Sequence, residues 1–203
     1  MQQMQRNIVL LIGFYIFWQW SQHFLSSDIV TKDKIVDRVH SLPIILEINE
    51  YLHNHPFVMK CNLILSSMLI DFNLVIILIM SLWRQKLKPI QILFVGLALR
   101  QLCQFINRLP MPESMVWFDP GWPSLFVTYD VANDFFFSGH TLISLIIGME
   151  FVSYHNIPAI IYGVTVMMYE ILFVIVIHGH YFMDIYAAIS TYFMLCYLHN
   201  FIF

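Results

Sequence analysis

Apolar residues fall into long runs along the chain, and short polar stretches separate these runs. A helix needs about 20 mostly apolar residues to cross a bilayer, and the chain contains six such runs. They cover residues 7–25, 60–83, 89–107, 135–154, 157–178 and 181–202. The pattern predicts an all-α fold, a polytopic membrane protein in which residues 1–203 form a single six-transmembrane-helix bundle.

The polar segments between the runs predict the topology. Arg84, Lys86 and Lys88 follow the second run closely, and basic residues in short connections mark the cytoplasmic side. If each run crosses the membrane once from this connection, the segments 26–57 and 108–134 lie on the lumenal or exoplasmic side and both termini are cytoplasmic. Residues 26–57 mix charged and aliphatic residues, and Pro43 interrupts any long helix there, so we expect an interfacial segment.

The composition excludes several classes of protein. Hydrophobic residues make up 59% of the 203 residues and charged residues 11%, which is more apolar surface than one small core can bury. The net charge of -3 carries no basic stripe, so a nucleic acid partner is not expected. The three cysteines lie inside apolar segments rather than in metal-like pairs, and we interpret them as packing residues.

Two histidine clusters interrupt the apolar pattern. The stretch "NDFFFSGHTLIS" places His140 near the start of the fourth run, where Asn133 and Asp134 are good capping residues. The stretch "VIHGHYFMDIYAA", which contains His180, follows the fifth run. Two antiparallel spans return the chain to the same depth, so we expect the two clusters to meet at the lumenal face.

The spacing of the second cluster is typical of a nucleophilic histidine. His180 and Asp184 are four residues apart, so on one helix the carboxylate reaches the ring and accepts Nδ1–H. Nε2 of His180 then keeps a free lone pair. His140 across the site is the candidate general acid and base. Together the three residues suffice for double-displacement phosphoryl transfer.

These motifs resemble the lipid phosphatase and phosphotransferase superfamily, and most closely its sphingomyelin synthase and cholinephosphotransferase-like branch. The D-x-x-x-S-G-H-T and H-x-H-Y-x-x-D motifs of that branch are matched by Asp134, Ser138, Gly139, His140, Thr141, His178, His180, Tyr181 and Asp184. Arg100 lies upstream in "RQLCQFINRLPMP", and a fainter likeness covers "DRV" at 37–39 and "EIN" at 47–49. In order and topology the similarity extends over roughly residues 37–195.

The resemblance implies an integral membrane enzyme with no cofactor and no metal. It would move a phospho-headgroup, phosphocholine foremost, from a phospholipid donor to ceramide or diacylglycerol. His180 would be the nucleophile that forms a phosphohistidine, Asp184 its orienting partner, and His140 the acid and base. Ser138, Gly139, Tyr181 and Asp134 would line the substrate site.

One departure from the superfamily bears on the choice between transfer and hydrolysis. Its phosphatases carry a serine–arginine pair ahead of the second histidine, where this chain has Phe173 and Val174. A phosphomonoester carries nearly two negative charges and depends more on that arginine than a phosphodiester does. Two alternatives remain, a lipid phosphate phosphatase in which water attacks the same intermediate, and a catalytically silent lipid-binding protein.

Further residues are candidates for substrate binding, each with a second interpretation. Trp117 and Trp122 suit a choline cation or an ordinary interfacial aromatic belt. Arg108 suits the phosphate or the lipid headgroups at the surface. His178 assists the donor site or caps its turn.

Three charged residues lie at similar depth in different runs. Asp71, Arg100 and Glu170 predict either an ion-pair network inside the bundle or the floor of a polar cavity. A zinc site from His178, His180 and Asp184 is disfavoured because it would consume Asp184 and leave His140 idle. The histidines at 23, 40, 53, 55, 155 and 199 are expected at the surface or the membrane interface.

Overall fold

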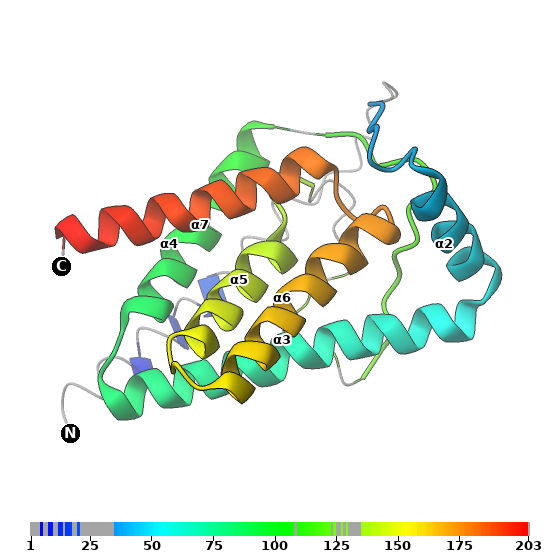
Figure 1. The fold of residues 1–203 in the computed structure, drawn as a ribbon. Coiled ribbons are helices and arrows are strands. Elements are labelled where there is room, and N and C mark those ends of the chain that lie inside the picture. The colour runs from blue at the N-terminus through cyan, green and yellow to red at the C-terminus, as the bar shows by residue number, and fades with distance from the viewer. Residues whose placement is uncertain are drawn as a thin grey trace.

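The structure is a computed structural model that describes residues 35–107, 109–122, 124, 127, 129 and 135–202, with scattered positions among residues 5–20. Its labelled elements are all helices, which confirms the predicted all-α class (Figure 1). They are α2 (Pro43–Asn54), α3 (Pro56–Arg84), α4 (Lys88–Ile106), α5 (Gly139–Val152), α6 (Ile157–Val176) and α7 (Phe182–Ile202).

Helices α3 to α7 lie side by side, and the short helix α2 lies at one end of them (Figure 1). The α3–α4 and α5–α6 connections lie at one end of this bundle, and the α6–α7 connection lies at the other (Figure 1). Prolines stand in the first turn of α2, α3, α4 and α6, where the missing N–H group removes no helical hydrogen bond. Pro43 is therefore the first residue of α2.

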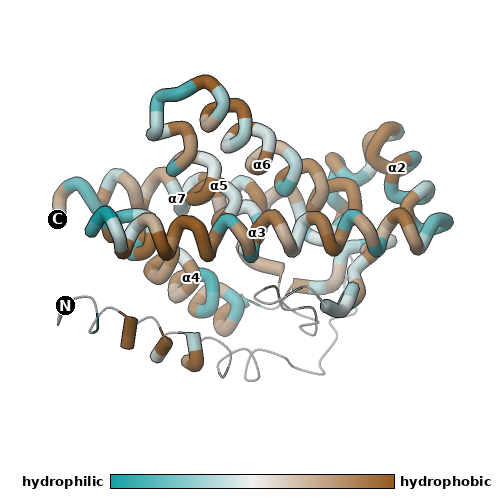
Figure 2. The backbone as a smooth tube through the Cα atoms, turned by 90° about the horizontal axis from the view of Figure 1, so that it is seen from below, coloured by the Kyte–Doolittle hydropathy of each residue, from teal (hydrophilic) through white to brown (hydrophobic). Residues whose placement is uncertain are grey.

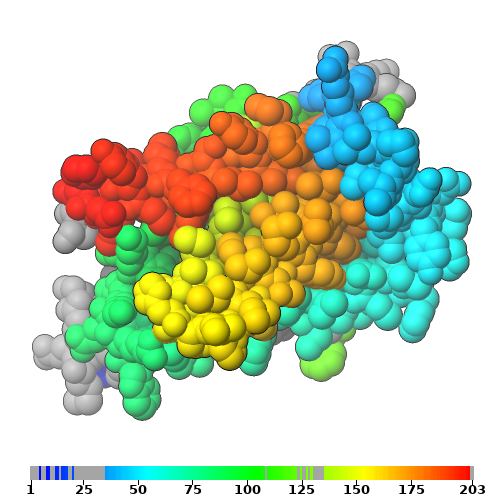
Figure 3. All heavy atoms as spheres, in the orientation of Figure 1, coloured from blue at the N-terminus to red at the C-terminus, as the bar shows by residue number. Residues whose placement is uncertain are grey.

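The core of the bundle consists mainly of aliphatic side chains from α3 to α7. Helix α5 is the innermost element, and α6 and α7 largely cover it in the space-filling view (Figure 3). The buried core residues include Ile70, Leu74, Leu93, Leu97, Leu142, Ile146, Ile147, Ala188 and Leu195.

Many large apolar side chains are exposed on the outside of the bundle, and the hydropathy colouring shows apolar residues along the helices (Figure 2). On α3 alone, Phe72, Ile79 and Trp83 are 64%, 57% and 86% exposed. Three described helices, α3, α4 and α6, are long and apolar enough to cross a membrane. The chain is therefore a multi-pass membrane protein, with apolar side chains directed to lipid.

The predicted number of six spans is not what the described residues show. In place of a span over 135–154, α5 has 14 residues and is about 21 Å long, shorter than the roughly 30 Å of a bilayer core. Residues 135–138 precede it without helical structure. Helix α7 has 21 residues but includes Asp184 and His199, and it is not among the candidate spans. The run 7–25 lies largely outside the described residues.

Candidate active site

The S-G-H-T motif forms the start of α5. Ser138 is the N-cap residue, and its Oγ accepts a hydrogen bond from the Thr141 N–H at 3.3 Å. The Ser138 N–H donates to the carbonyl oxygen of Asp184 at 3.2 Å, which ties the start of α5 to the start of α7. The expectation that Asn133 and Asp134 cap this helix is wrong, because the N-cap residue immediately precedes the first helical residue.

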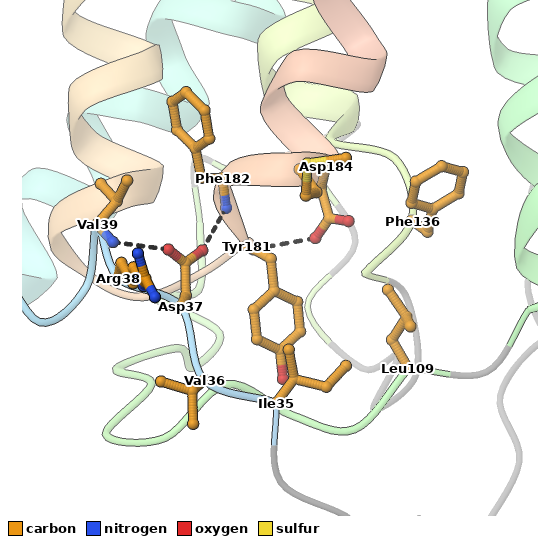
Figure 4. A pocket seen from close by; sticks show the side chains of 11 residues that line it. Ile35, Val36, Asp37, Arg38, Val39, Leu109, Phe136, Tyr181, Phe182 and Asp184 are labelled. Carbon is orange, nitrogen blue, oxygen red and sulfur yellow. Dashed lines mark hydrogen bonds between the residues drawn. The ribbon is translucent and has the colours of Figure 1, made fainter.

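His180 is held by two acceptors. Its Nδ1 lies 2.9 Å from the carbonyl oxygen of Phe135 and 3.5 Å from Oδ2 of Asp184. A carbonyl oxygen only accepts hydrogen bonds, so Nδ1 carries the proton and Nε2 of the neutral ring keeps its lone pair. Oδ2 of Asp184 also accepts the Tyr181 N–H at 3.0 Å (Figure 4). Sequence reasoning found Asp184 but missed Phe135, because a backbone acceptor leaves no signal in residue identity.

His140 stands on the first turn of α5 with a free ring nitrogen. The rings of Trp117 and His140 meet edge to face, with planes at 85° and centroids 5.4 Å apart. Its Nε2 is buried and has no hydrogen-bond partner among the described residues. Both His180 and Arg100 lie within electrostatic range of the ring. The two histidines that lie forty positions apart in the sequence thus share one site.

Arg100 brings a buried positive charge to the same place. The side chain is 5% exposed, and its Nε donates to the carbonyl oxygen of Phe137 at 2.8 Å. Gly139 allows this approach, since a Cβ there would lie 3.2 Å from Nε of Arg100. The guanidinium also acts electrostatically on Asp184. A cation next to the amino end of α5 is a suitable environment for phosphate oxygens.

The turn before α7 carries His178 and is fastened to the segment after α4. His178 has a φ of 54°, in the left-handed region that non-glycine residues rarely occupy. Its Nδ1 lies 2.7 Å from the carbonyl oxygen of Glu113, and its Nε2 is buried without a partner among the described residues. The Tyr181 hydroxyl donates to the carbonyl oxygen of Pro110 at 2.9 Å. The L-P-M-P stretch therefore forms one wall of the histidine site.

His40 belongs to this site, and the expectation that it lies at the surface is wrong. The residue is 7% exposed, and its Nε2 lies 3.0 Å from the carbonyl oxygen of His180. Its ring stacks on His178, with centroids 4.1 Å apart and planes 7° apart. Burial first and His178 second hold the pKa of His40 below its ordinary value, while Asp37 and the His180 carbonyl act in the opposite direction. The faint likeness at 37–39 was the only signal nearby.

The two tryptophan candidates differ in position. Trp117 contacts His140 and also packs on Tyr129, with centroids 4.8 Å apart. Trp122 is 87% exposed, so its side chain is not packed into the histidine site. The Tyr129 hydroxyl pairs with the Ser67 hydroxyl on α3. Trp117 and Tyr129 therefore form an aromatic wall beside His140.

Acidic side chains lie behind this aromatic wall. Glu170 on α6 is fully buried, and its Oε2 accepts a hydrogen bond from the Ser66 hydroxyl at 2.6 Å. Asp71 on α3 is 5% exposed, and both carboxylates act electrostatically on Tyr129. A polar layer thus continues from the histidine site into the α3–α6 interface.

A cavity of about 400 Å³ opens beside Asp184 (Figure 4). Its polar lining residues are Asp37, Arg38, Tyr181 and Asp184, and its apolar ones are Ile35, Val36, Val39, Leu109, Phe136, Phe182 and Met183. Oδ1 of Asp184 is buried and has no hydrogen-bond partner in the described part of the chain. The apolar walls suit a hydrocarbon chain next to the polar site.

Two candidate residues, Arg108 and Asp134, lie outside the described residues. Within the described residues, no group of three histidine, cysteine or acidic side chains is arranged to hold a metal ion.

No known protein family, curated protein or solved structure matches this chain.

Proposed function

We propose that this protein is an integral membrane phosphotransferase that moves a phospho-headgroup from a phospholipid to a lipid hydroxyl through a phosphohistidine on His180. The observation that carries the proposal is that two histidines of one site each keep an available ring nitrogen. Nδ1–H of His180 is committed to Phe135, which leaves its Nε2 as a nucleophile. His140, within electrostatic range, has a buried Nε2 without a partner among the described residues.

The reaction balances with these two residues alone. Nε2 of His180 attacks the phosphorus of the phosphodiester, and the bond from phosphorus to the diacylglycerol oxygen breaks. His140, protonated once the anionic phosphodiester is bound beside it, gives its proton to that departing oxygen. The acceptor hydroxyl then gives its proton back to His140, its oxygen attacks phosphorus, and the phosphorus–nitrogen bond breaks to release His180.

Asp184 and Arg100 support the charges that develop in this reaction. The imidazolium that forms when His180 bonds to phosphorus lies 3.5 Å from Oδ2 of Asp184. Arg100 and the amino end of α5 lie on the side of His140 and stabilise the phosphoryl oxygens. One buried arginine suits the single negative charge of a phosphodiester.

The headgroup we favour is phosphocholine. Trp117 and Tyr129 form an aromatic wall beside His140, and Asp71 and Glu170 lie behind it. The faces of aromatic rings attract a quaternary ammonium group. The motif resemblance to the sphingomyelin synthase branch points to the same headgroup.

For the membrane arrangement, we propose that α7 crosses together with α3, α4 and α6, and that the 14-residue α5 lies enclosed among them without spanning the bilayer core by itself. Helices α5 and α7 pack against α4. The connection with Arg84, Lys86 and Lys88 lies at the end of the bundle opposite to the α6–α7 turn (Figure 1). By the positive-inside rule the histidines then face the lumenal or exoplasmic side.

The test uses purified protein in liposomes that contain phosphatidylcholine labelled in its phosphocholine group, with ceramide or diacylglycerol added as acceptor. Wild type, His180→Ala and His140→Gln are compared for labelled lipid products and for label released into water. We expect label in a new lipid with wild type and losses of at least about 100-fold in both variants. Label released only into water would make the protein a hydrolase, and activity retained in His180→Ala would refute the mechanism.

A further inference from the structure

The segment before α2 contacts the backbone at and after His180, although it lies outside both histidine motifs. His40 meets the carbonyl oxygen of His180 at 3.0 Å. Three residues earlier, Oδ2 of Asp37 accepts the N–H of Phe182 at 2.6 Å (Figure 4). The peptide groups on the C-terminal side of His180 are therefore held by residues about 140 positions away in the sequence.

The contacts of His40 determine which of its ring nitrogens carries the hydrogen. A carbonyl oxygen cannot donate, so Nε2 of His40 must carry the hydrogen in this contact. The neutral ring then has its lone pair on Nδ1, and the ring plane is fixed by the stack on His178 at 4.1 Å. His178 is fixed in turn by its contact with the Glu113 carbonyl oxygen. His40 thus approaches His180 in one orientation only.

The side chain and the main chain of His180 are held by different elements. Nδ1 is bound by Phe135 from the segment before α5, and the carbonyl oxygen is bound by His40 from the segment before α2. A ring held only at Nδ1 can still pivot about that hydrogen bond if the backbone shifts. Fixing the carbonyl removes this freedom and sets the direction of the Nε2 lone pair.

We infer that His40 is a positioning residue for His180, which aims the nucleophilic nitrogen by fixing the backbone of the residue that carries it. The inference rests on the proposed function, because it assigns His40 a part in the attack on phosphorus. His40 does not contact the reacting atoms. Its loss is expected to slow formation of the phosphohistidine while substrate binding is retained.

Two substitutions separate the hydrogen bond from the stacked ring. His40→Phe keeps a planar ring against His178 but removes the donor, whereas His40→Gln loses the ring but keeps an N–H donor at the place of Nε2. His55→Phe is the matched control. Like His40, His55 contacts a carbonyl oxygen, that of Tyr51 at 2.7 Å from Nδ1, and stacks on a ring, that of Tyr51 at 4.1 Å. His55 is exposed, however, and lies at the α2–α3 junction.

The experiment measures labelled phosphohistidine on His180 by rapid quench, together with kcat and KM for phosphatidylcholine in liposomes. We expect His40→Phe to lower the rate of label formation by about 10- to 100-fold with KM within about twofold of wild type. His40→Gln should recover most of this loss, and His55→Phe should match wild type.

The outcomes distinguish this inference from the proposed function. If wild type forms no phosphohistidine and transfers no label, the proposed function fails. If wild type transfers label and His40→Phe equals it, or His40→Gln is as slow as His40→Phe, His40 is not a positioning residue through its donor. A rise in KM with unchanged kcat would place His40 in substrate binding and overturn the inference.

Discussion

The carbonyl oxygen of Phe135 is the nearer of two acceptors for Nδ1 of His180, at 2.9 Å against 3.5 Å for Oδ2 of Asp184. A main-chain acceptor has no charge, so it fixes the tautomer of His180 without stabilising an imidazolium. Asp184 supplies the charge. The two roles, which one carboxylate performs in many histidine sites, are therefore divided between two residues.

This division predicts an intermediate effect for Asp184→Asn. The Phe135 carbonyl keeps Nδ1 protonated, so the variant retains the proposed nucleophile and loses only the charge interaction. We expect kcat to fall by about 10- to 100-fold, which corresponds to the roughly 1.5–3 kcal/mol of a hydrogen bond to a charged group. Headgroup transfer in liposomes measures the effect, and a loss as large as that of His180→Ala would contradict the divided roles.

Replacement by alanine is expected to change KM at one tryptophan and not at the other. Trp117→Ala removes the ring that touches His140 and Tyr129, whereas Trp122 is 87% exposed. We expect Trp117→Ala to raise KM for phosphatidylcholine by about 2- to 30-fold, the range of a cation–π contact of roughly 0.5–2 kcal/mol. Trp122→Ala should leave KM unchanged. An equal rise in both variants would assign them to membrane anchoring instead.

The apolar pattern located most of the helices, because length and composition decide where a segment can cross lipid. Four of the predicted runs coincide with α3, α4, α6 and α7 to within about four residues. The apolar pattern placed the start of the fourth helix too early, because "FFF" before Ser138 is as apolar as the helix that follows. Hydropathy cannot distinguish a buried non-helical segment from a buried helix.

The neighbours within the candidate site were predictable where side chains make the contacts and not where the backbone makes them. His140, His180 and Asp184 follow from spacing and from an antiparallel pair of helices. Phe135 acts through its carbonyl oxygen, and His40 comes from a distant segment whose path no local pattern reveals. Such contacts depend on tertiary structure alone.

Helices α5 and α6 pack so closely at Gly148 and Gly163 that adding a single methyl group there is expected to destabilise the protein. A Cβ at Gly163 would lie 2.5 Å from the carbonyl oxygen of Gly148, a backbone atom that cannot move aside. At Gly96 the nearest atom is Cδ2 of Leu142, at 2.7 Å on the end of a flexible side chain. We expect Gly163→Ala to lower the free energy of unfolding in detergent by about 1–3 kcal/mol. Gly96→Ala should lower it by less, and the reverse order would refute this packing.

Acidification is expected to destabilise the protein through His40. Burial and His178 lower the pKa of this residue from 6.5 in spite of Asp37 and the His180 carbonyl. Below pH 6.5 the unfolded chain therefore takes up a proton at His40 that the folded protein does not, and stability falls with pH until the lowered folded pKa is reached.

His40→Gln removes this titration, so the drop in Tm between pH 7 and pH 5 should be smaller than in wild type. The comparison is made by thermal unfolding in detergent, with the exposed His55→Gln as a control for the loss of a histidine. Equal drops in wild type and His40→Gln would mean that His40 takes up its proton equally in both states. The proton would then have to be accommodated on a buried ring that is stacked on His178 at 4.1 Å, and burial disfavours the charged form of His40.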